Sequence, residues 1–357
     1  IKDEYYEVPS ERPKDRITRP DIPSFGEKTV SKYKYVRGGK KDGKKFNDLE
    51  IVSEDNLTKR FKQAHNALWG GGELNPSEAF DELDKLIFCK IWDERNCKRG
   101  EPYKFQVISE FVVKNGKEEP SIEETNKKLK ERIEELYEEG KKKDPEVFKE
   151  PVRLNATKIR TVVGYLEGIN LNKTDLDSKG RAFETFMGSF FRGDFGQYFT
   201  PRPIVKFIVD VLPIKNDSYV LDTSCGSGGF LLHALEKVRI QANDEFPDFE
   251  TDPDDRLDWK KYWHDFAEKY LFGIEINEQI ARTAKMNMII HDDGHTNVIS
   301  CDGLLKIKDI QLKSKNKGFK ENHFDFIITN PPFGSPIKQT EKAYLHQYGF
   351  GVKETDW

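Results

Sequence analysis

After Gly196 the sequence alternates short apolar segments with longer segments of helical pattern, and this alternation constrains the fold more than any other feature. Apolar segments separated in this way form parallel strands, with the connecting helices packed on both faces of the sheet. In open sheets of this kind, ligands bind beyond the carboxyl ends of the strands. Each of the four predicted strands ends in a candidate functional residue. The strands are predicted at 219–222, 271–276, 297–301 and 324–329.

Residues 48–192 have helical patterns instead. One helix is predicted to end at the glycines 70–72. The next has Asn75 as its N-cap, Pro76 at the first helical position and Glu78 closing a capping box. Further helices are predicted at 121–143, 155–167 and 177–191. The chain is therefore predicted to be α/β, with an all-helical N-terminal domain at 48–192 and a sheet domain at 193–357.

Residues 1–47 differ from both regions in composition. They contain four prolines and then a basic, glycine-rich run at 37–45, which favours extended segments and turns. We interpret this region as a linker or the tail of a missing domain. The basic run is expected to be a solvated loop, with contact to phosphate as the alternative.

Net charge and cysteine content exclude several classes of protein. The net charge is −4, so any contact with nucleic acid has to come from local basic surface. The four cysteines form no CxxC pair, which speaks against a metal site or a disulfide framework and favours a reducing cytoplasm. The sequence shows no leader pattern and no apolar run of about 18 residues. We therefore expect a soluble, cytoplasmic protein with no metal and no membrane partner.

A glycine-rich turn follows the first predicted strand, in the sequence Leu-Asp-Thr-Ser-Cys-Gly-Ser-Gly-Gly-Phe at 221–230. Glycines between a strand and a helix let the backbone approach a ligand and aim free N–H groups at it. A plain tight turn is the alternative. The dinucleotide fingerprint fails at Leu231, and no Gly-Lys-Ser/Thr follows, so a dehydrogenase and an NTPase are both disfavoured.

Acidic residues end the second and third predicted strands. Glu275 could accept hydrogen bonds from both hydroxyls of a ribose, and Asp302 could accept one from an adenine amine. The alternatives are a surface acid and an Asp-Gly turn. Glu275 lies further from the glycine-rich turn than the usual distance of about 20 residues. An acidic insertion at 241–265 would explain the excess.

The fourth predicted strand ends in Asn330-Pro331-Pro332-Phe333, the most specific signal in the chain. The prolines fix the backbone, so the Asn330 side chain and the Pro331 carbonyl become a rigid pair of acceptors. An adenine amine is a poor nucleophile because its lone pair is delocalised into the ring. Two acceptors would draw its nitrogen towards tetrahedral geometry, and Phe333 offers a face for an extruded base. A proline-rich turn, the alternative, accounts poorly for all four residues in order.

These motifs, preceded by the sequence Gly-Gln-Tyr-Phe-Thr-Pro-Arg at 196–202, resemble in their order the N6-adenine DNA methylase family of type I modification subunits. The resemblance covers residues 55–334 and implies a Rossmann-like sheet that uses S-adenosylmethionine to methylate N6 of adenine in DNA. The family's sheet continues beyond the fourth motif. We therefore expect a fragment, truncated after the fourth strand motif and inactive by itself.

The resemblance implies a role for each motif residue. The methionine end of S-adenosyl-L-methionine would lie against Gln197, Tyr198, Phe199, Thr200, Pro201 and Arg202. The methionine moiety would be surrounded by Asp222, Ser224, Cys225, Gly226 and Gly228. Glu275 would hold the ribose, Ile276 would pack on the cofactor adenine, and Asp302 would bind its amine. The catalytic residues at the target base would be Asn330, Pro331, Pro332 and Phe333.

Two motif positions qualify these roles. Thr200 stands before a proline and is also a good helix N-cap, so its hydroxyl could instead be structural. Thr223 stands where the family often has proline.

The partners implied by the resemblance are double-stranded DNA and a separate specificity subunit, with a restriction subunit or a fused nuclease domain as further candidates. Two other functions stay open. One is a methyltransferase that acts on protein glutamine or an RNA base, since Asn-Pro-Pro-aromatic motifs also serve such enzymes. The other is a non-catalytic protein that binds DNA or a specificity subunit. The helical lead-in, with 183–187 and 197–202, favours a DNA methylase.

Overall fold

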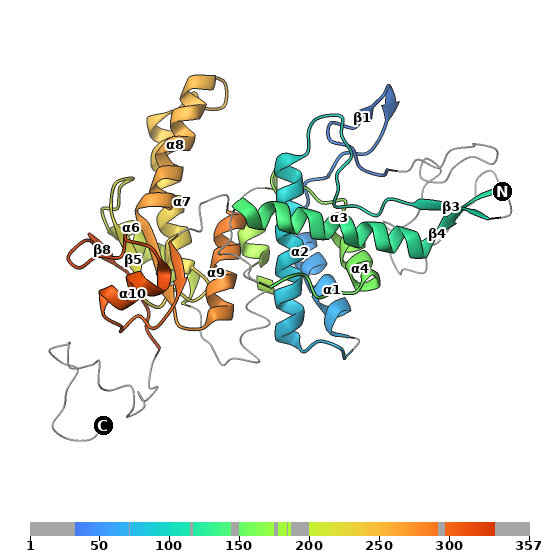
Figure 1. The fold of residues 1–357 in the computed structure, drawn as a ribbon. Helices are drawn as coiled ribbons and strands as arrows, with labels where there is room; N and C mark the ends of the chain where they lie inside the picture. The colour runs from blue at the N-terminus through green and yellow to red at the C-terminus, as the bar shows by residue number, and fades with distance from the viewer. Residues whose placement is uncertain are drawn as a thin grey trace.

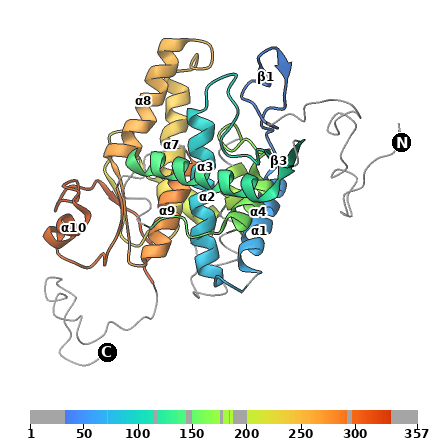
Figure 2. The same cartoon turned by 45° about the vertical axis from the view of Figure 1, so that its right-hand side comes forward.

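The computed structural model describes residues 33–70, 72–114, 117–143, 150–174, 178–183, 185–186, 200–291 and 297–332. The described residues form a helical part and a part built on a parallel sheet. Helix α9 (Glu278–Ile290) lies where the two parts meet (Figures 1 and 2).

The helical part begins and ends its helices largely where the local signals predict. Asn75 caps α2 in the predicted capping box: the Glu78 N–H donates to its side chain at 2.9 Å, and its own N–H donates to the Glu78 carboxylate at 3.0 Å. Phenylalanine side chains fill the core between the helices, as in the stacked pair Phe80 and Phe186, whose ring centroids are 5.4 Å apart. The helices are α1 (Glu54–Trp69), α2 (Pro76–Asn96), α3 (Ile122–Lys143) and α4 (Ala156–Leu166).

Residues 48–192 are not helical throughout. Strands β3 (Glu110–Lys114) and β4 (Lys117–Ser121) form an antiparallel hairpin between α2 and α3. The sequence carries a signal for this hairpin, because Asn115-Gly116 between two short segments is the strongest short-range pattern for a two-residue turn. The charged side chains of the second segment, which are exposed in the structure, hid that signal.

The described part of the segment predicted as a linker packs on the helical part. Val36 is fully buried and forms a bridge with Pro102, and the Lys34 ammonium lies 2.7 Å from the Glu167 carboxylate. The basic run forms a small antiparallel hairpin of β1 (Lys40–Lys41) and β2 (Lys44–Lys45). Residues 33–47 are therefore tied to the helices by backbone and side-chain contacts.

The predicted parallel sheet is confirmed among the described residues. Its strands are β5 (Val220–Asp222), β6 (Leu271–Glu275), β7 (Val298–Ser300) and β8 (Phe326–Ile327), in the order β7-β6-β5-β8. Strand β5 pairs on both sides, with Leu221 opposite Phe272 and also opposite Ile327. Strand β8 is shorter than predicted. Besides α9, this part contains α6 (Arg202–Val211), α7 (Gly229–Glu245), α8 (Pro253–Lys269) and α10 (Ile307–Ser314).

The segment interpreted as an insertion is a pair of packed helices. Helix α7 continues to Glu245, and α8 returns alongside it towards β6, so the pair projects from the sheet (Figure 1). Near the tip Phe249 stacks on Trp259, with ring centroids 4.6 Å apart and planes 8° from parallel. The excursion between β5 and β6 is therefore ordered.

Helix α9 belongs to the cores of both parts. Ile280, Met286 and Ile289 lie in one apolar cluster with the side chains of α1 and α2. Ala284 and Met288 lie in the cluster that packs against the sheet. The sheet part is thus joined to the helical part through a shared helix.

Within the described ranges, each helix is too short or too polar to span a bilayer. Among the same residues, no group of three or more His, Cys, Asp or Glu side chains is arranged to hold a metal ion.

Candidate functional site

The tips of the four parallel strands meet at one edge of the sheet. The Gly226 N–H, after β5, donates to the Glu275 carboxylate at the end of β6 at 3.0 Å. Gly303, after β7, lies so close to the β5 tip that a Cβ there would stand 2.7 Å from the Thr223 carbonyl oxygen. The Thr223 hydroxyl also lies 3.2 Å from that of Thr329, after β8. The candidate residues of four separate motifs therefore share one edge.

The glycine-rich turn needs its glycines. Gly226 and Gly228 have φ values of 53° and 87°, a left-handed backbone that residues with a Cβ rarely adopt. The Ser224 N–H donates to the Asp222 carboxylate at 3.0 Å and closes the turn from below. The first helical residue of α7 follows at once, at Gly229. Because Gly226 and Gly228 carry no Cβ, a ligand can come close to the backbone of this turn.

Glu275 is buried but keeps its capacity to accept hydrogen bonds. Its side chain accepts from the Gly226 N–H at 3.0 Å and from the Asn277 N–H at 2.9 Å, one on each oxygen. Burial raises the pKa of this carboxyl, while these backbone donors oppose the rise. A carboxylate oxygen offers two lone pairs, so each can accept once more. The predicted ribose acceptor thus lies beside the glycine-rich turn.

Asp222 and Cys225 lie beneath the turn. Asp222 is 2% exposed, and its burial, together with the charge of Glu275, raises its pKa to about 7. The Cys225 side chain is buried against Gly273, and its N–H donates to the Ile274 carbonyl at 2.8 Å. Burial raises the pKa of its thiol well above the ordinary value. Both side chains face the protein, so they support the turn from within.

Ile276 and Asp302, the two predicted ligands of the cofactor's adenine, have different surroundings. Ile276 follows Glu275 directly and is 70% exposed, which leaves an apolar surface beside the buried carboxylate. Asp302 follows β7 and accepts from the Leu304 N–H at 2.9 Å, which is the contact of an Asp-Gly turn. This contact shows that the side chain also shapes its own loop.

Asn330 is held by the segment that precedes the sheet. Its amide nitrogen donates to the Thr200 hydroxyl at 2.8 Å, across 130 residues of sequence. Helix α6 begins at Arg202 with Pro201 as its N-cap and no side-chain capping bond, so the alternative of Thr200 as the N-cap is wrong. Pro331 and Pro332 follow Asn330 at the same strand tip, whereas Gln197, Tyr198, Phe199 and Phe333 lie outside the described residues.

Asn287 supports this edge and was not predicted from the sequence. Asn287, on α9, is fully buried, and its side-chain amide donates to the Ser227 carbonyl in the middle of the glycine-rich turn at 3.0 Å. A lone asparagine within the apolar sequence Met-Asn-Met matches no motif. Its only signal is a polar side chain at a buried helical position, which requires a partner.

The N-6 DNA Methylase family model matches residues 174–355, about half of the chain. The chain belongs to this family. Among curated relatives, the chain is 31% identical over 160 residues to the type I restriction enzyme MjaIX methylase subunit of Methanocaldococcus jannaschii, covering 44% of this chain and 23% of that protein. It is 28% identical over 202 residues to the type II restriction enzyme and methyltransferase RM.BcgI of Heyndrickxia coagulans, covering 56% and 28%. The chain thus spans about a quarter of the length of these relatives.

The fold of one solved modification subunit is similar to that of this chain. It is a modification subunit assigned to a type I restriction enzyme of Vibrio vulnificus YJ016, with a TM-score of 0.53 and 19% identity, covering 83% of this chain and 64% of the other. The similarity extends over more of the chain than the family model, which supports the arrangement of a helical part beside a parallel sheet.

Proposed function

We propose that this chain forms the cofactor-binding part of a DNA adenine-N6 methyltransferase, the modification subunit of a type I-like restriction-modification system. The observation that carries the proposal is the meeting of Gly226, Glu275 and Asn330 at one edge of the sheet, through the contacts of the four strand tips. Family membership and relatives named as methylase subunits support the same function.

The residues at this edge fit S-adenosylmethionine. The buried Glu275 carboxylate retains acceptor positions for the two ribose hydroxyls, and the exposed Ile276 beside it offers an apolar surface for the adenine ring. The backbone at Gly226 and Gly228 lets the methionine end come close. Asp302 after β7 and the segment 197–202 complete the proposed set. When bound, the cofactor supplies a methyl group on a sulfonium sulfur.

The orientation of Asn330 suits an adenine amine. The Asn330 amide nitrogen donates to the Thr200 hydroxyl, and in this orientation the amide oxygen can accept from another donor. That oxygen and the Pro331 carbonyl would each accept one N–H of the amine, and the nitrogen lone pair would then point out of the ring plane. In this proposal Pro332 fixes the backbone and Phe333 stacks on the extruded base.

The partners follow from the same proposal. Double-stranded DNA is the substrate, and a specificity subunit selects the sequence, with a restriction subunit or nuclease domain as a further partner. In this assignment residues 48–192 form the helical domain and residues 193–357 form the methyltransferase domain. Residues 1–47 are a linker or the tail of another domain, and their described part, 33–47, packs on the helical domain. Relatives named as restriction enzyme subunits favour DNA over protein glutamine or RNA as the substrate.

Calorimetry with S-adenosylmethionine tests the cofactor site on the chain itself. We expect a Kd of about 1 μM, which corresponds to about 8 kcal/mol. Glu275→Ala should weaken binding by roughly 10- to 100-fold, since hydrogen bonds to a charged group contribute about 1.5–3 kcal/mol. Glu119→Ala, at an exposed position on β4 in the helical part, is the matched control. Equal affinity of wild type and Glu275→Ala would refute the assignment.

A second measurement separates the base site from the cofactor site. In a longer chain that includes the rest of the methyltransferase sheet, assembled with its specificity subunit and DNA, Asn330→Ala should abolish methyl transfer to adenine while cofactor affinity stays within about twofold. Thr200→Val should lower the rate less, because it removes only the group that orients the Asn330 amide. Unchanged methylation in Asn330→Ala would contradict the proposed role.

A further inference from the structure

Helix α9 starts at the proposed ribose acceptor. Asn277 is the N-cap of α9, and its side chain accepts from the Gln279 and Ile280 N–H groups at 2.9 and 3.2 Å. The N–H of the same Asn277 donates to the Glu275 carboxylate. A rotation or shift of the first turn of α9 would therefore move a donor that fixes Glu275.

The same helix contacts the glycine-rich turn. The Asn287 amide, ten residues after Asn277 and so about three turns further along α9, donates to the Ser227 carbonyl. A Cβ at Gly228 would stand 3.7 Å from the Met288 sulfur and 3.8 Å from the Ala284 Cβ, so the turn packs directly on α9. Both elements proposed to hold the cofactor thus rest on one helix.

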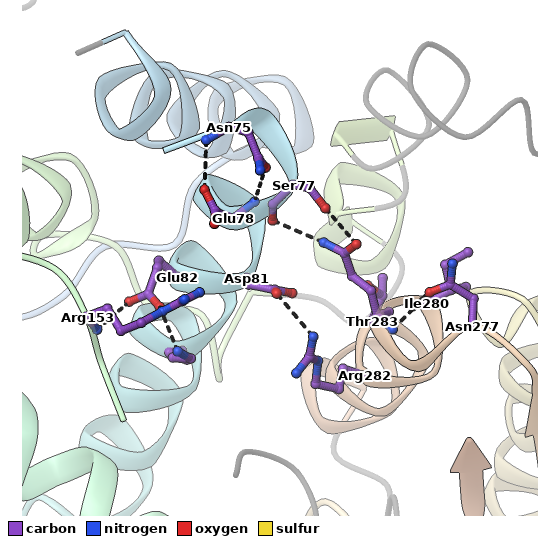
Figure 3. A network of polar contacts seen from close by, with 12 residues as sticks. Asn75, Ser77, Glu78, Asp81, Glu82, Arg153, Asn277, Ile280, Arg282 and Thr283 are labelled. Atoms are coloured by element: carbon purple, nitrogen blue, oxygen red, sulfur yellow. Dashed lines mark hydrogen bonds and ion pairs between the residues drawn. The ribbon is translucent and has the colours of Figure 1, made fainter. Parts of the chain in front are cut away.

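The helical part contacts α9 at the first turn of that helix. The Ser77 hydroxyl donates to the Gln279 side-chain oxygen at 2.6 Å, and the Gln279 side-chain nitrogen donates to the Ser77 carbonyl at 3.0 Å. One turn further, Arg282 lies 3.1 Å from the Asp81 carboxylate. Figure 3 shows Asp81 of α2 turned towards Arg282 of α9, Ser77 facing the same helix, and the capping box of Asn75 and Glu78 beside Ser77.

We propose that the first turn of α2 positions the cofactor site through α9, with Ser77 and Gln279 as positioning residues. The reciprocal pair of hydrogen bonds fixes the start of α9, Asn277 carries that position to Glu275, and Asn287 carries it to the glycine-rich turn. Cofactor affinity then depends on the docking of the helical part. By linkage, a bound cofactor strengthens that docking by the same factor. The inference rests on the proposed cofactor site.

Calorimetry on the full chain tests this inference. Gln279→Ala and Ser77→Ala should each weaken the binding of S-adenosylmethionine by roughly 3- to 30-fold, the usual range for coupling through a structural element. Ser77→Thr, which keeps the hydroxyl, should restore the affinity. The matched control is Asn66→Ala, which removes an exposed amide on α1 of the same helical part.

Hydrogen exchange without cofactor gives the second readout. If the first turn of α9 is loosened in Gln279→Ala, the amides of Gly226 and Asn277, which both donate to Glu275, should exchange faster than in wild type. Unchanged exchange and unchanged affinity in a folded Gln279→Ala would overturn the inference, as would an equal loss of affinity in Asn66→Ala. A wild-type chain that binds no cofactor would end the proposed function instead, and exchange alone would then decide the positioning.

Discussion

Burial changes the protonation of Asp222, an acid that the sequence motif predicts as a cofactor ligand. The side chain is 2% exposed, and its carboxylate closes the glycine-rich turn through the Ser224 N–H. Its ionised form is poorly solvated there, and the neighbouring Glu275 adds a like charge. The residue therefore supports the turn at an energetic cost that depends on pH.

Replacing Asp222 by asparagine should flatten the pH dependence of stability. The pKa is about 7 in the folded chain against an ordinary 3.8, so the folded state holds the proton more tightly. The free energy of unfolding should fall as pH rises from about 4 to about 7, by roughly 4 kcal/mol at most. Urea unfolding at several pH values should show a smaller fall in Asp222→Asn than in wild type. Part of the fall remains in the variant because burial also raises the pKa of Glu275. Asp258→Asn, exposed on α8, is the control, and parallel profiles for Asp222→Asn and wild type would contradict the prediction.

At the scale of elements, the tips of β5 and β7 lie against each other through one close backbone contact. Gly303→Ala would place a Cβ 2.7 Å from the Thr223 carbonyl oxygen, so the loop after β7 would have to move away from β5. We expect a loss of about 1–3 kcal/mol in the free energy of unfolding. Gly229→Ala, at the first residue of α7 with no atom within 4 Å of the new Cβ, should cost nothing. Equal stabilities of the two variants, measured by urea unfolding, would disprove the close contact.

Elements with local signals could be predicted from the sequence, and contacts between distant residues could not. The capping box of α2 lies within four consecutive residues, and the apolar segments marked all four strands of the sheet. The parallel sheet then implied that Gly226 and Glu275 share an edge. The bond between Asn330 and Thr200 spans 130 positions, and nothing in either motif indicates the other as its partner.

The molecule as a whole depends on α9 because two cores share it. Ile289→Ala would open a cavity in the cluster that joins α9 to the helical part, at a cost of about 2–5 kcal/mol. Hydrogen exchange should become faster in α2 and in β6 by similar factors, since α9 also packs on the sheet. Leu312→Ala, 77% exposed on α10, should change neither. Faster exchange in α2 alone would show that the two parts unfold independently.

Helices α7 and α8 lengthen the chain between two site residues without changing where those residues lie in the site. Gly226 and Glu275 stand 49 positions apart, yet the pairing of β6 with β5 brings them into contact. The bend at 246–252 lies at the far end of this pair. An affinity peptide inserted at that bend would give a handle for immobilising the chain, with the edge that bears Glu275 left facing solution.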